Sequence, residues 1–420
     1  MNRARVLGAM GLMLCATPAP AETLRNAVEA ALASNPSLAA AAARQDALSE
    51  TPEQAQAEGR LQASADAAGG YNKFDYGKGG AASVAANLPV WTGGRVSYAV
   101  KAARDDVAAG QESLRDTRAR LILQVVSIYA ELLFDQQSVA ITRTDIDLLK
   151  QQVAEARARF KLGKDTMADV SQLETQLASA RATLAEAETT LRTSSADYRS
   201  IVGHDPGQMI AASNLAQLPA TQEAARAWAL DGNPRYLRSI RAADAANARV
   251  HKAHAAGAPT VSLLGNYSYG LRTDNIGGNG YVHDANLGLS LHIPILTGGL
   301  IASQARQASA QFRAARFDTD TAAREAVRAA DVAWASLRGA RSRTAANQER
   351  VQAADLALRA VRAEYGFDLR STLDVLLADE NLRSAQLALA RSKSDELVAQ
   401  ASLLRATGNL ELEVFSLASR

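Results

Sequence analysis

Two of the five histidines, His251 and His254, lie three residues apart in a stretch with helical spacing. That spacing places both side chains on one face of a helix, where they could share a metal ion. No third residue stands at a recognisable ligand spacing from the pair. His283 and His292 fall in alternating stretches, and His204 falls in a linker. We therefore interpret the histidines as polar surface residues and predict neither a metal site nor a cofactor.

Motifs for nucleotide binding and for nucleophilic catalysis are also missing from the sequence. The stretch Gly277-Gly278-Asn279-Gly280 is rich in glycine, but no helix follows it, as phosphate binding would require. The only cysteine is Cys15, which lies in an apolar run near the N-terminus. A lipid-anchor site would need a small residue before Cys15, where Leu14 stands. We predict that the protein is not an enzyme.

The first 21 residues have the three parts of a secretory signal peptide. Arg3 and Arg5 form the basic part, Val6 to Ala16 the apolar part, and Ala19-Pro20-Ala21 the cleavage site. We predict residues 1–21 as a signal peptide that is cleaved before Glu22. The mature chain would then be exported and would have no cysteine.

Charge and composition exclude a nucleic-acid partner and favour an elongated shape. The chain has 46 Lys and Arg residues against 44 Asp and Glu residues, and without Arg3 and Arg5 the two totals are equal. This balance lacks the basic excess of nucleic-acid binders. Aromatic residues make up only 5% of the chain, and alanine is abundant. Small side chains suit helices that pack closely along narrow seams rather than a thick core.

Three pairs of residues recur in the same order, at nearly the same spacing, in the two halves of the chain. They are Asn35-Pro36 with Asn233-Pro234, Gly93-Gly94 with Gly298-Gly299, and Asp169-Val170 with Asp374-Val375. Such recurrence indicates an internal duplication. We predict a first structural repeat at 22–220 and a second at 221–420.

Each repeat is predicted to begin with two helices. The first of the two helices ends at the Asn-Pro pair, because proline begins a helix but cannot continue one. The expected helices are Leu24 to Ser34 and Pro36 to about Arg60, then Gln222 to Gly232 and Pro234 to about Ala256.

The period then changes from that of a helix to that of a strand. Apolar and polar residues alternate over a hairpin at about 61–92 and another at about 260–296, with Arg272 to Gly280 as the loop of the second. Alternation alone fits either a sheet over a soluble core or strands in a membrane. Tyrosines near the strand ends favour the membrane: Tyr71, Tyr76, Tyr267, Tyr269 and Tyr281. Because four strands cannot close a barrel, the membrane interpretation requires an oligomer.

The same junction follows each hairpin, as LPVWTGGR from Leu88 and as IPILTGGL from Ile293. We expect Pro89 and Pro294 to end strand pairing, because proline has no N–H for the ladder. The glycine pairs Gly93-Gly94 and Gly298-Gly299 would let the chain turn from sheet to helix.

A long helical hairpin follows each junction. The expected spans are about 96–203 and about 301–407, with turns near Phe160 to Asp165 and Tyr365 to Arg370. A C-terminal tail completes the chain. Apolar residues three and four apart, such as Leu173 and Leu177, predict coiled-coil packing of the returning helices.

These features together, with the segment AEYGFDLRSTLDVLLADENL from Ala363 to Leu382, resemble the TolC-like outer-membrane efflux and secretion proteins. The resemblance implies a homotrimer with a 12-stranded transmembrane β-barrel in the outer-membrane lipid. A 12-helix α-barrel in the periplasm would continue the β-barrel. It also implies a passive exit duct of a tripartite type I secretion or drug-efflux system, with a periplasmic adaptor and an inner-membrane ABC or RND-type transporter as partners. The segment LRSTLDVL resembles the branch of the family that serves type I secretion and TolC-dependent efflux.

The resemblance also assigns a periplasmic gate to the turn of the second helical hairpin. It carries over to Tyr365, Arg370 and Asp374, with Asp169 in the first hairpin as the acceptor for Tyr365. An ordinary surface ion pair is the alternative for Arg370 and Asp374.

Two features depart from the family pattern at this gate. Leu377 stands where a second acid is expected, with Asp379 offset from that position, and Asp368 rather than glycine matches Gly163. The alternative function from another class is a soluble periplasmic coiled-coil adaptor or scaffold. It would need a lipoyl-like or small β-barrel domain between its helices, and the sequence shows no sign of one.

Overall fold

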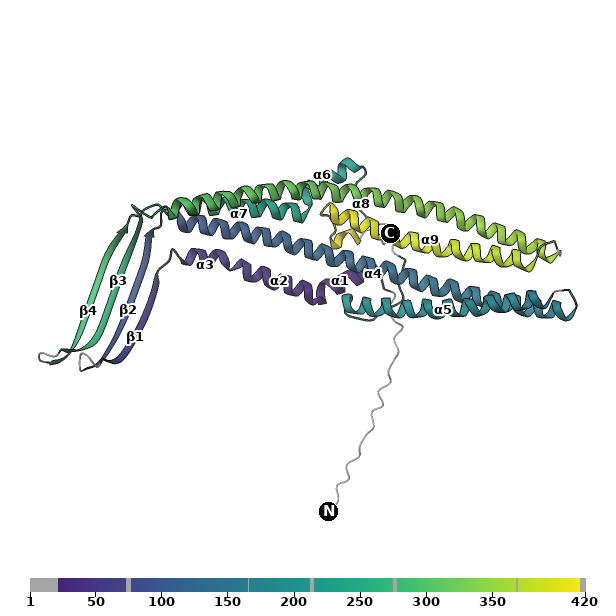
Figure 1. Cartoon of the computed structure of the whole chain (residues 1–420), viewed down its shortest axis with the longest axis horizontal. Helices are drawn as coiled ribbons and strands as arrows, with labels where there is room; N and C mark the ends of the chain where they lie inside the picture. Colours follow the sequence, from purple (N-terminus) through teal and green to yellow (C-terminus); the bar gives the residue numbers. More distant parts are fainter. Residues whose placement is uncertain are drawn as a thin grey trace, which may run out of the picture.

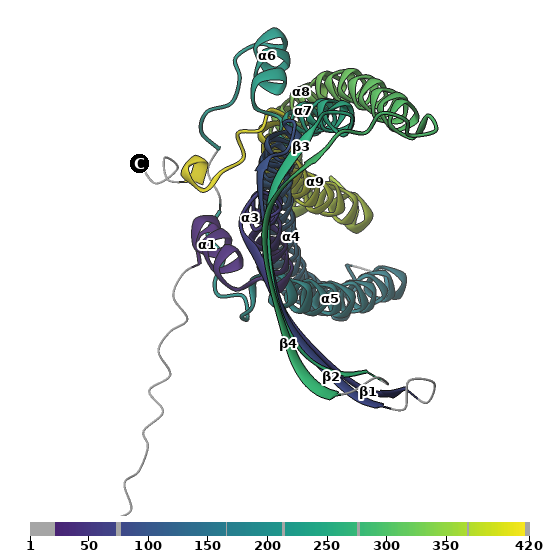
Figure 2. The same cartoon turned by 90° about the vertical axis from the view of Figure 1, so that its left-hand side faces the viewer.

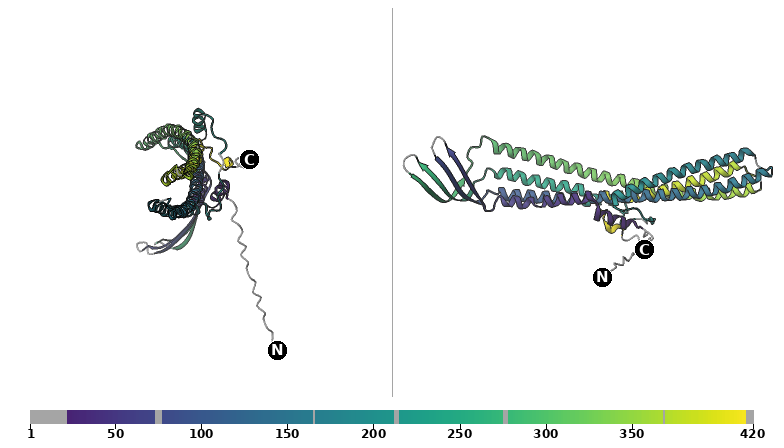
Figure 3. Two further views of the ribbon diagram at one scale, coloured as in Figure 1. Left: turned by 90° about the vertical axis from the view of Figure 1, so that its right-hand side faces the viewer. Right: turned by 90° about the horizontal axis from the view of Figure 1, so that it is seen from below.

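The computed structural model is a long helical rod with a β-sheet projecting from one end (Figure 1). It describes residues 22–72, 77–164, 166–211, 215–274, 278–367 and 369–415. The predicted signal peptide with Cys15, the side chains of Tyr71 and Tyr76, and the residues Gly277 and Asp368 lie outside the description. Viewed along the rod, the helices form an arc, with α1 (Leu24–Ser34), α6 (Gln222–Gly232) and the C-terminal segment on its convex side (Figures 2 and 3).

Two pairs of long helices form most of the rod. The 67-residue α4 (Arg95–Lys161) folds back into α5 (Met167–Val202), and the 67-residue α8 (Leu300–Gly366) folds back into α9 (Thr372–Ala406). Shorter helices α2 (Pro36–Ser49), α3 (Thr51–Ala57) and α7 (Pro234–Ala255) lie along α4 near the sheet, and η1 (Leu412–Phe415) is a 3₁₀ turn. Within the described ranges, no helix combines the length and the apolar content needed to cross a membrane.

The strands form one antiparallel sheet in the order β1 (Gln62–Asn72), β2 (Gly77–Trp91), β3 (Thr260–Asp274) and β4 (Gly278–His292). The register aligns the alternating residues of all four strands. Ala65 pairs with Val84, Val84 with Tyr267, and Tyr267 with Ala285. Because successive side chains point to opposite faces, this register gives one continuous apolar face and one face rich in Ser and Asn.

Apolar seams at two levels hold the long helices together. In the first hairpin, Ile146, Leu149 and Val153 of α4 pack on Leu173 and Leu177 of α5. The largest core cluster lies midway along the rod, where α1 and the C-terminal segment cover α4, α5 and α9. A mainly helical fold with four antiparallel strands was predicted and is confirmed.

Two expected boundaries were wrong. The helix expected from Pro36 to Arg60 is split at Glu50, because Pro52 occupies the first turn of α3 and cannot continue α2. The loop expected from Arg272 to Gly280 is mostly strand, since β3 continues to Asp274 and β4 begins at Gly278.

Candidate functional site

A capping box closes the turn at the far tip of the first hairpin. Thr166 caps α5: its hydroxyl accepts a bond of 3.2 Å from the Asp169 backbone N–H, and the Asp169 carboxylate accepts one of 3.0 Å from the Thr166 backbone N–H. These hydrogen bonds to Thr166 lower the pKa of Asp169 below its usual value. The side chain of Asp169 therefore fixes the start of α5.

The tip of the second hairpin repeats this device. Ser371 caps α9 through a bond of 3.2 Å from the Asp374 N–H, and the Asp374 carboxylate accepts a 3.0 Å bond from the Ser371 N–H. The pKa of Asp374 is lowered by the bonds to Ser371 and then by the charge of Arg370. Arg370 itself donates to Glu364 at 2.7 Å, and both side chains are about half exposed.

Tyr365 does not bind the acceptor that was expected for it. Among the described residues it makes no hydrogen bond to Asp169, whose carboxylate is engaged by Thr166. Its ring lies instead under the guanidinium of Arg159 in α4, 5.0 Å from carbon to ring centre. A cation–π contact therefore links the tips of the two hairpins of one chain. At an exposed site such a contact contributes only about 0.5–1 kcal/mol.

Leu377 and Asp379, which mark a departure from the family pattern, have different surroundings. Leu377 is exposed, whereas Asp379 is buried against Asp145 of α4. Burial and then the charge of Asp145 raise the pKa of Asp379 to about 6. Arg362 of α8 lies 3.4 Å from Asp379, and Arg383 lies 3.8 Å from Asp145. Asp379 therefore belongs to a helix–helix contact.

The glycine pairs occupy the predicted positions between sheet and helix. Gly94 and Gly299 are the N-cap residues of α4 and α8, with φ of 86° and 82°. Gly93 has φ of 62°, and a Cβ there would lie 2.3 Å from the Cβ of Ala258. This position requires glycine for both conformation and space.

The prolines at the two junctions behave differently. β4 ends at His292, before Pro294. Pro89 does not end its strand, because β2 continues to Trp91 through an irregularity in its pairing with β3. A bulge accommodates the missing N–H of a strand proline.

Each of the two Asn-Pro pairs joins the start of one helix to the end of another, α2 to α5 and α7 to α9. The sequence alone did not reveal this role. The Asn35 side chain accepts from the Ser37 N–H at 3.0 Å, while its amide donates to Ile201 O at the end of α5 at 3.1 Å. Asn233 accepts from the Arg235 N–H and donates to Ala406 O at the end of α9, at 3.0 and 2.9 Å. Each asparagine therefore satisfies groups of two helix ends at once.

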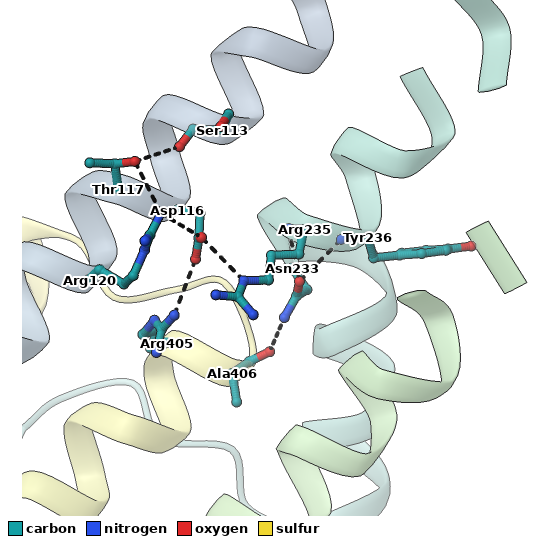
Figure 4. A network of polar contacts seen from close by, with 9 residues as sticks. All are labelled: Ser113, Asp116, Thr117, Arg120, Asn233, Arg235, Tyr236, Arg405 and Ala406. Carbon is teal, nitrogen blue, oxygen red and sulfur yellow. Dashed lines mark hydrogen bonds and ion pairs between the residues drawn. The ribbon is translucent and has the colours of Figure 1, made fainter. Parts of the chain in front are cut away.

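A charged network surrounds the second of these joints, as Figure 4 shows. Asp116 of α4 accepts from Arg235 at 3.2 Å and from Arg405 at 3.4 Å, and Arg120 lies 3.2 Å away. Three elements distant in sequence thus meet at one carboxylate. The helix break at Asn233-Pro234 was the one part of this site that the sequence indicated.

Two buried tyrosines fix the N-terminal segment to the middle of the rod. The Tyr129 hydroxyl lies 2.6 Å from Ile210 O and 2.9 Å from Glu22 O, and burial raises the pKa of Tyr129 to about 12. Tyr198 donates to the Glu22 carboxylate, which also accepts from the Gly207 N–H at 2.9 Å. Both phenols therefore stay protonated and act as donors.

Two of the histidines contact other side chains of the rod. His251 stacks on Tyr98, with ring centres 5.1 Å apart, and His204 lies 3.5 Å from the Glu22 carboxylate. In the part of the chain that the structure describes, no three His, Cys, Asp or Glu residues are grouped as metal ligands.

Comparison with known proteins assigns this geometry to a family. The sequence model described as "Outer membrane efflux protein" matches residues 27–204 and 228–409. The chain belongs to the outer membrane efflux protein family. The resemblance inferred from the sequence is confirmed, and the protein is an exit duct in the outer membrane.

Similar proteins span most of the chain. The chain is 33% identical over 345 residues to the outer membrane efflux protein BepC of Brucella suis. The matched residues make up 82% of this chain and 75% of BepC. The chain is 27% identical to the outer membrane protein TolC of Vibrio cholerae, over 70% of this chain and 69% of TolC. It is 24% identical to the alkaline protease secretion protein AprF of Pseudomonas aeruginosa, over 71% of this chain and 64% of AprF.

Solved structures share the fold at low sequence identity. CusC superimposes with a TM-score of 0.80 at 19% identity, covering 93% of both chains. VceC of Vibrio cholerae gives a TM-score of 0.75 at 22% identity, covering 92% of this chain and 97% of VceC. Both structures therefore share the fold of this chain.

Proposed function

We propose that three copies of this chain form one export duct of a tripartite system. Four strands from each copy would close a 12-stranded barrel in the outer membrane. The long helices would continue it as a 12-helix tube in the periplasm. Substrate would pass through passively, driven by an inner-membrane transporter.

The observation that carries this proposal is the exposed apolar face of the sheet. Leu287, Leu289 and Leu291 of β4 are 77%, 71% and 61% exposed in the single chain. An apolar face of this extent marks a membrane or a protein interface. The opposite face carries polar residues such as Ser64, Asn266 and Asn286, which suits the wall of an aqueous channel.

The free edges of the sheet support the trimer. β1 and β4 are the outer strands, and each has only one neighbour in the sheet. Unpaired backbone groups are not tolerated in lipid, so each edge needs a strand from another copy. The soluble-adaptor alternative needs a covered sheet, yet this sheet projects beyond the helices.

The partners would dock at the helical tips. We assign a periplasmic adaptor and an inner-membrane ABC or RND-type transporter to this end, with Tyr365, Arg370, Asp374 and Asp169 as the gate. The proposal is supported by the weak contacts of these residues, which are capping bonds, an exposed ion pair and a cation–π contact, and which a docked partner can replace. The names of the relatives divide between secretion of proteases, as for AprF, and efflux, as for BepC.

The signal peptide and the two structural repeats are part of the same proposal. Residues 1–21 would be removed as a signal peptide, and 22–220 and 221–420 would be two repeats of one plan. The equal lengths of α4 and α8 and the matching roles of Asn35 and Asn233 support the duplication.

Disulfide trapping between the sheet edges tests the trimer. Cysteine at Ser64 of β1 is combined with cysteine at Asn286, Gly288 or Ser290 of β4, and outer membranes are analysed without reductant. We expect at least one combination to give linked dimers and trimers. The pair Ser64 and Ala85, which are partners within one chain, controls for competence to oxidise. Monomers alone from all three combinations would overturn the proposal.

Deletion of the gene would separate the two kinds of cargo. Loss of a protein from the culture medium, at unchanged drug tolerance, supports type I secretion. Lower tolerance to toxic compounds with an unchanged set of secreted proteins supports drug efflux.

A further inference from the structure

A recess of about 730 Å³ lies halfway along the rod, between α4, α8 and α9 and next to the start of α7. Small side chains on all three long helices leave this space open, among them Ala119, Ala333, Ser336, Ala399 and Ser402. The volume falls in the range of sites that hold small organic molecules. We call it the arginine recess because of the charges described next.

Cations outnumber anions around the recess. Its lining includes five arginines and three acids: Arg235, Arg328, Arg343, Arg391 and Arg405, against Asp116, Glu131 and Asp395. All three acids already hold an arginine. Asp116 binds Arg235 and Arg405, while Glu131 and Asp395 lie 2.7 and 3.3 Å from Arg391.

Two arginines of α8 remain without an acid. Among the described residues, Arg328 and Arg343 make no ion pair, and both are exposed at the recess. They are 15 residues apart, which is roughly 22 Å along a helix. The buried Nε of Arg405 also has no hydrogen-bond partner in the described part of the chain. A guanidinium without a partner is a ready donor for a carboxylate or a sulfonate.

Apolar groups lie between these charges. Val332 of α8, which is 55% exposed, and Val398 of α9 line the recess between its two ends. A ligand that fits this lining has an anionic head and an apolar body.

The recess opens away from the main core. The α9 residues Asp395 and Ser402, which line it, lie on the side opposite Leu397 and Leu404, which pack into the core with α1. Because α1 lies on the convex side of the arc (Figures 2 and 3), the recess on the opposite side of α9 faces the concave side.

We propose that the arginine recess binds amphiphilic organic anions, with the head group on Arg328 or Arg343 and the apolar body on Val332 and Val398. The inference rests on the proposed function, in which the concave side lines the duct. Each copy would then offer one such site to anions that pass through.

Titration of the purified protein in lipid nanodiscs with naphthalene-1-sulfonate tests this site. We expect saturable binding of one probe per chain, followed by fluorescence anisotropy. The uncharged 1-naphthalenemethanol should bind at least about tenfold more weakly, because it lacks the charge-assisted bond. The double variant Arg328→Gln and Arg343→Gln should lose about tenfold in affinity for the sulfonate. Arg338→Gln, on the same helix but outside the recess, should bind like the wild type.

Arginine labelling of the wild-type protein provides a measurement that does not depend on how variants fold. Naphthalene-1-sulfonate should protect Arg328 or Arg343 from phenylglyoxal, detected by mass spectrometry, and should leave Arg338 reactive. Equal binding of the neutral probe, or equal protection of Arg338, would overturn the proposal. Native mass spectrometry of the same sample separates the two claims: a trimer without binding contradicts the recess alone, whereas a monomer contradicts the proposed function.

Discussion

The middle of the rod and its far tip are held by different kinds of contact. In the middle, Tyr129 and Tyr198 are fully buried, and their hydrogen bonds reach residues far away in the sequence. At the tip, Thr166 binds Asp169 and Arg370 binds Glu364, which are contacts within three to six residues on an exposed surface.

This difference makes the middle of the rod a rigid scaffold and the far tip a part that can move. Buried aromatic residues stabilise a structure by several kcal/mol each, because their loss leaves a cavity. Capping bonds contribute about 1 kcal/mol, and exposed ion pairs contribute less. A docked partner can therefore rearrange the tip while the middle keeps its geometry. The predictions below test this contrast, from the largest expected effect to the smallest.

Replacement of Tyr129 should have the largest effect. Tyr129→Ala removes a fully buried ring and two hydrogen-bond contacts, and should lower the free energy of unfolding by about 3–5 kcal/mol. The fall in the thermal midpoint of the purified protein checks this. Tyr365→Ala at the tip is the control and should change the midpoint only slightly. Equal decreases in the thermal midpoint of the two variants would contradict the difference between the middle of the rod and its tip.

Asp379 should make the contact between α9 and α4 sensitive to pH. Its pKa is raised to about 6 from the usual 3.8, so its stabilising contribution is complete below about pH 4 and is lost as the pH rises through about 6. The groups that face it are Asp145 of α4, Arg362 of α8, and Glu380 and Arg383 of its own helix.

Asp379→Asn should remove this loss, because the amide stays neutral. The variant should be more stable than the wild type at pH 7.5, by about 3 kcal/mol, by roughly half of that at pH 5, and similar to it only below about pH 4. Hydrogen exchange of the α9 amides measures the difference. Asp374→Asn is the matched control, since the lowered pKa of Asp374 gives the opposite dependence, with stability lost at acid pH. A wild type that exchanges equally at pH 5 and 7.5 would contradict the assignment.

Loss of a capping hydroxyl should loosen one tip only. Thr166→Ala removes the cap of α5 and should raise amide exchange over the first turn of that helix roughly fivefold, as expected for about 1 kcal/mol. Thr183→Ala, whose hydroxyl binds only a carbonyl of its own helix, is the control. Faster exchange throughout the rod would show that the tip is not independent of the middle.

Arg370→Gln should have the smallest effect on stability, because its bond to Glu364 is exposed and screened by salt. We expect a thermal midpoint close to that of the wild type, with any difference disappearing at high ionic strength. A large decrease that persists in salt would place Arg370 in the scaffold.

Features that depend on neighbouring residues could be predicted from the sequence. Helix starts at Pro36 and Pro234 and the alternation of Leu287, Leu289 and Leu291 depend on neighbouring residues, so the sequence indicated them directly. The split of the second helix at Glu50 was missed, although Pro52 is a local signal for it.

Contacts between distant segments could not be predicted in the same way. Asn35 and Asn233 were recognised as helix breaks, but their bonds to Ile201 and Ala406 depend on the folding back of the long helices. The role of Asp169 was assigned by resemblance to a bond with Tyr365, whereas its nearest donors are those of Thr166.

Single-channel recording in planar lipid bilayers tests most directly the claim that this protein is a duct that opens at the tip. The wild type is predicted to form channels, and the double variant Tyr365→Ala and Arg370→Gln is predicted to conduct more, because it loses the ring under Arg159 and the bond to Glu364 while the middle is intact. Absence of channels from correctly folded protein, or an unchanged conductance in the double variant, would contradict the account.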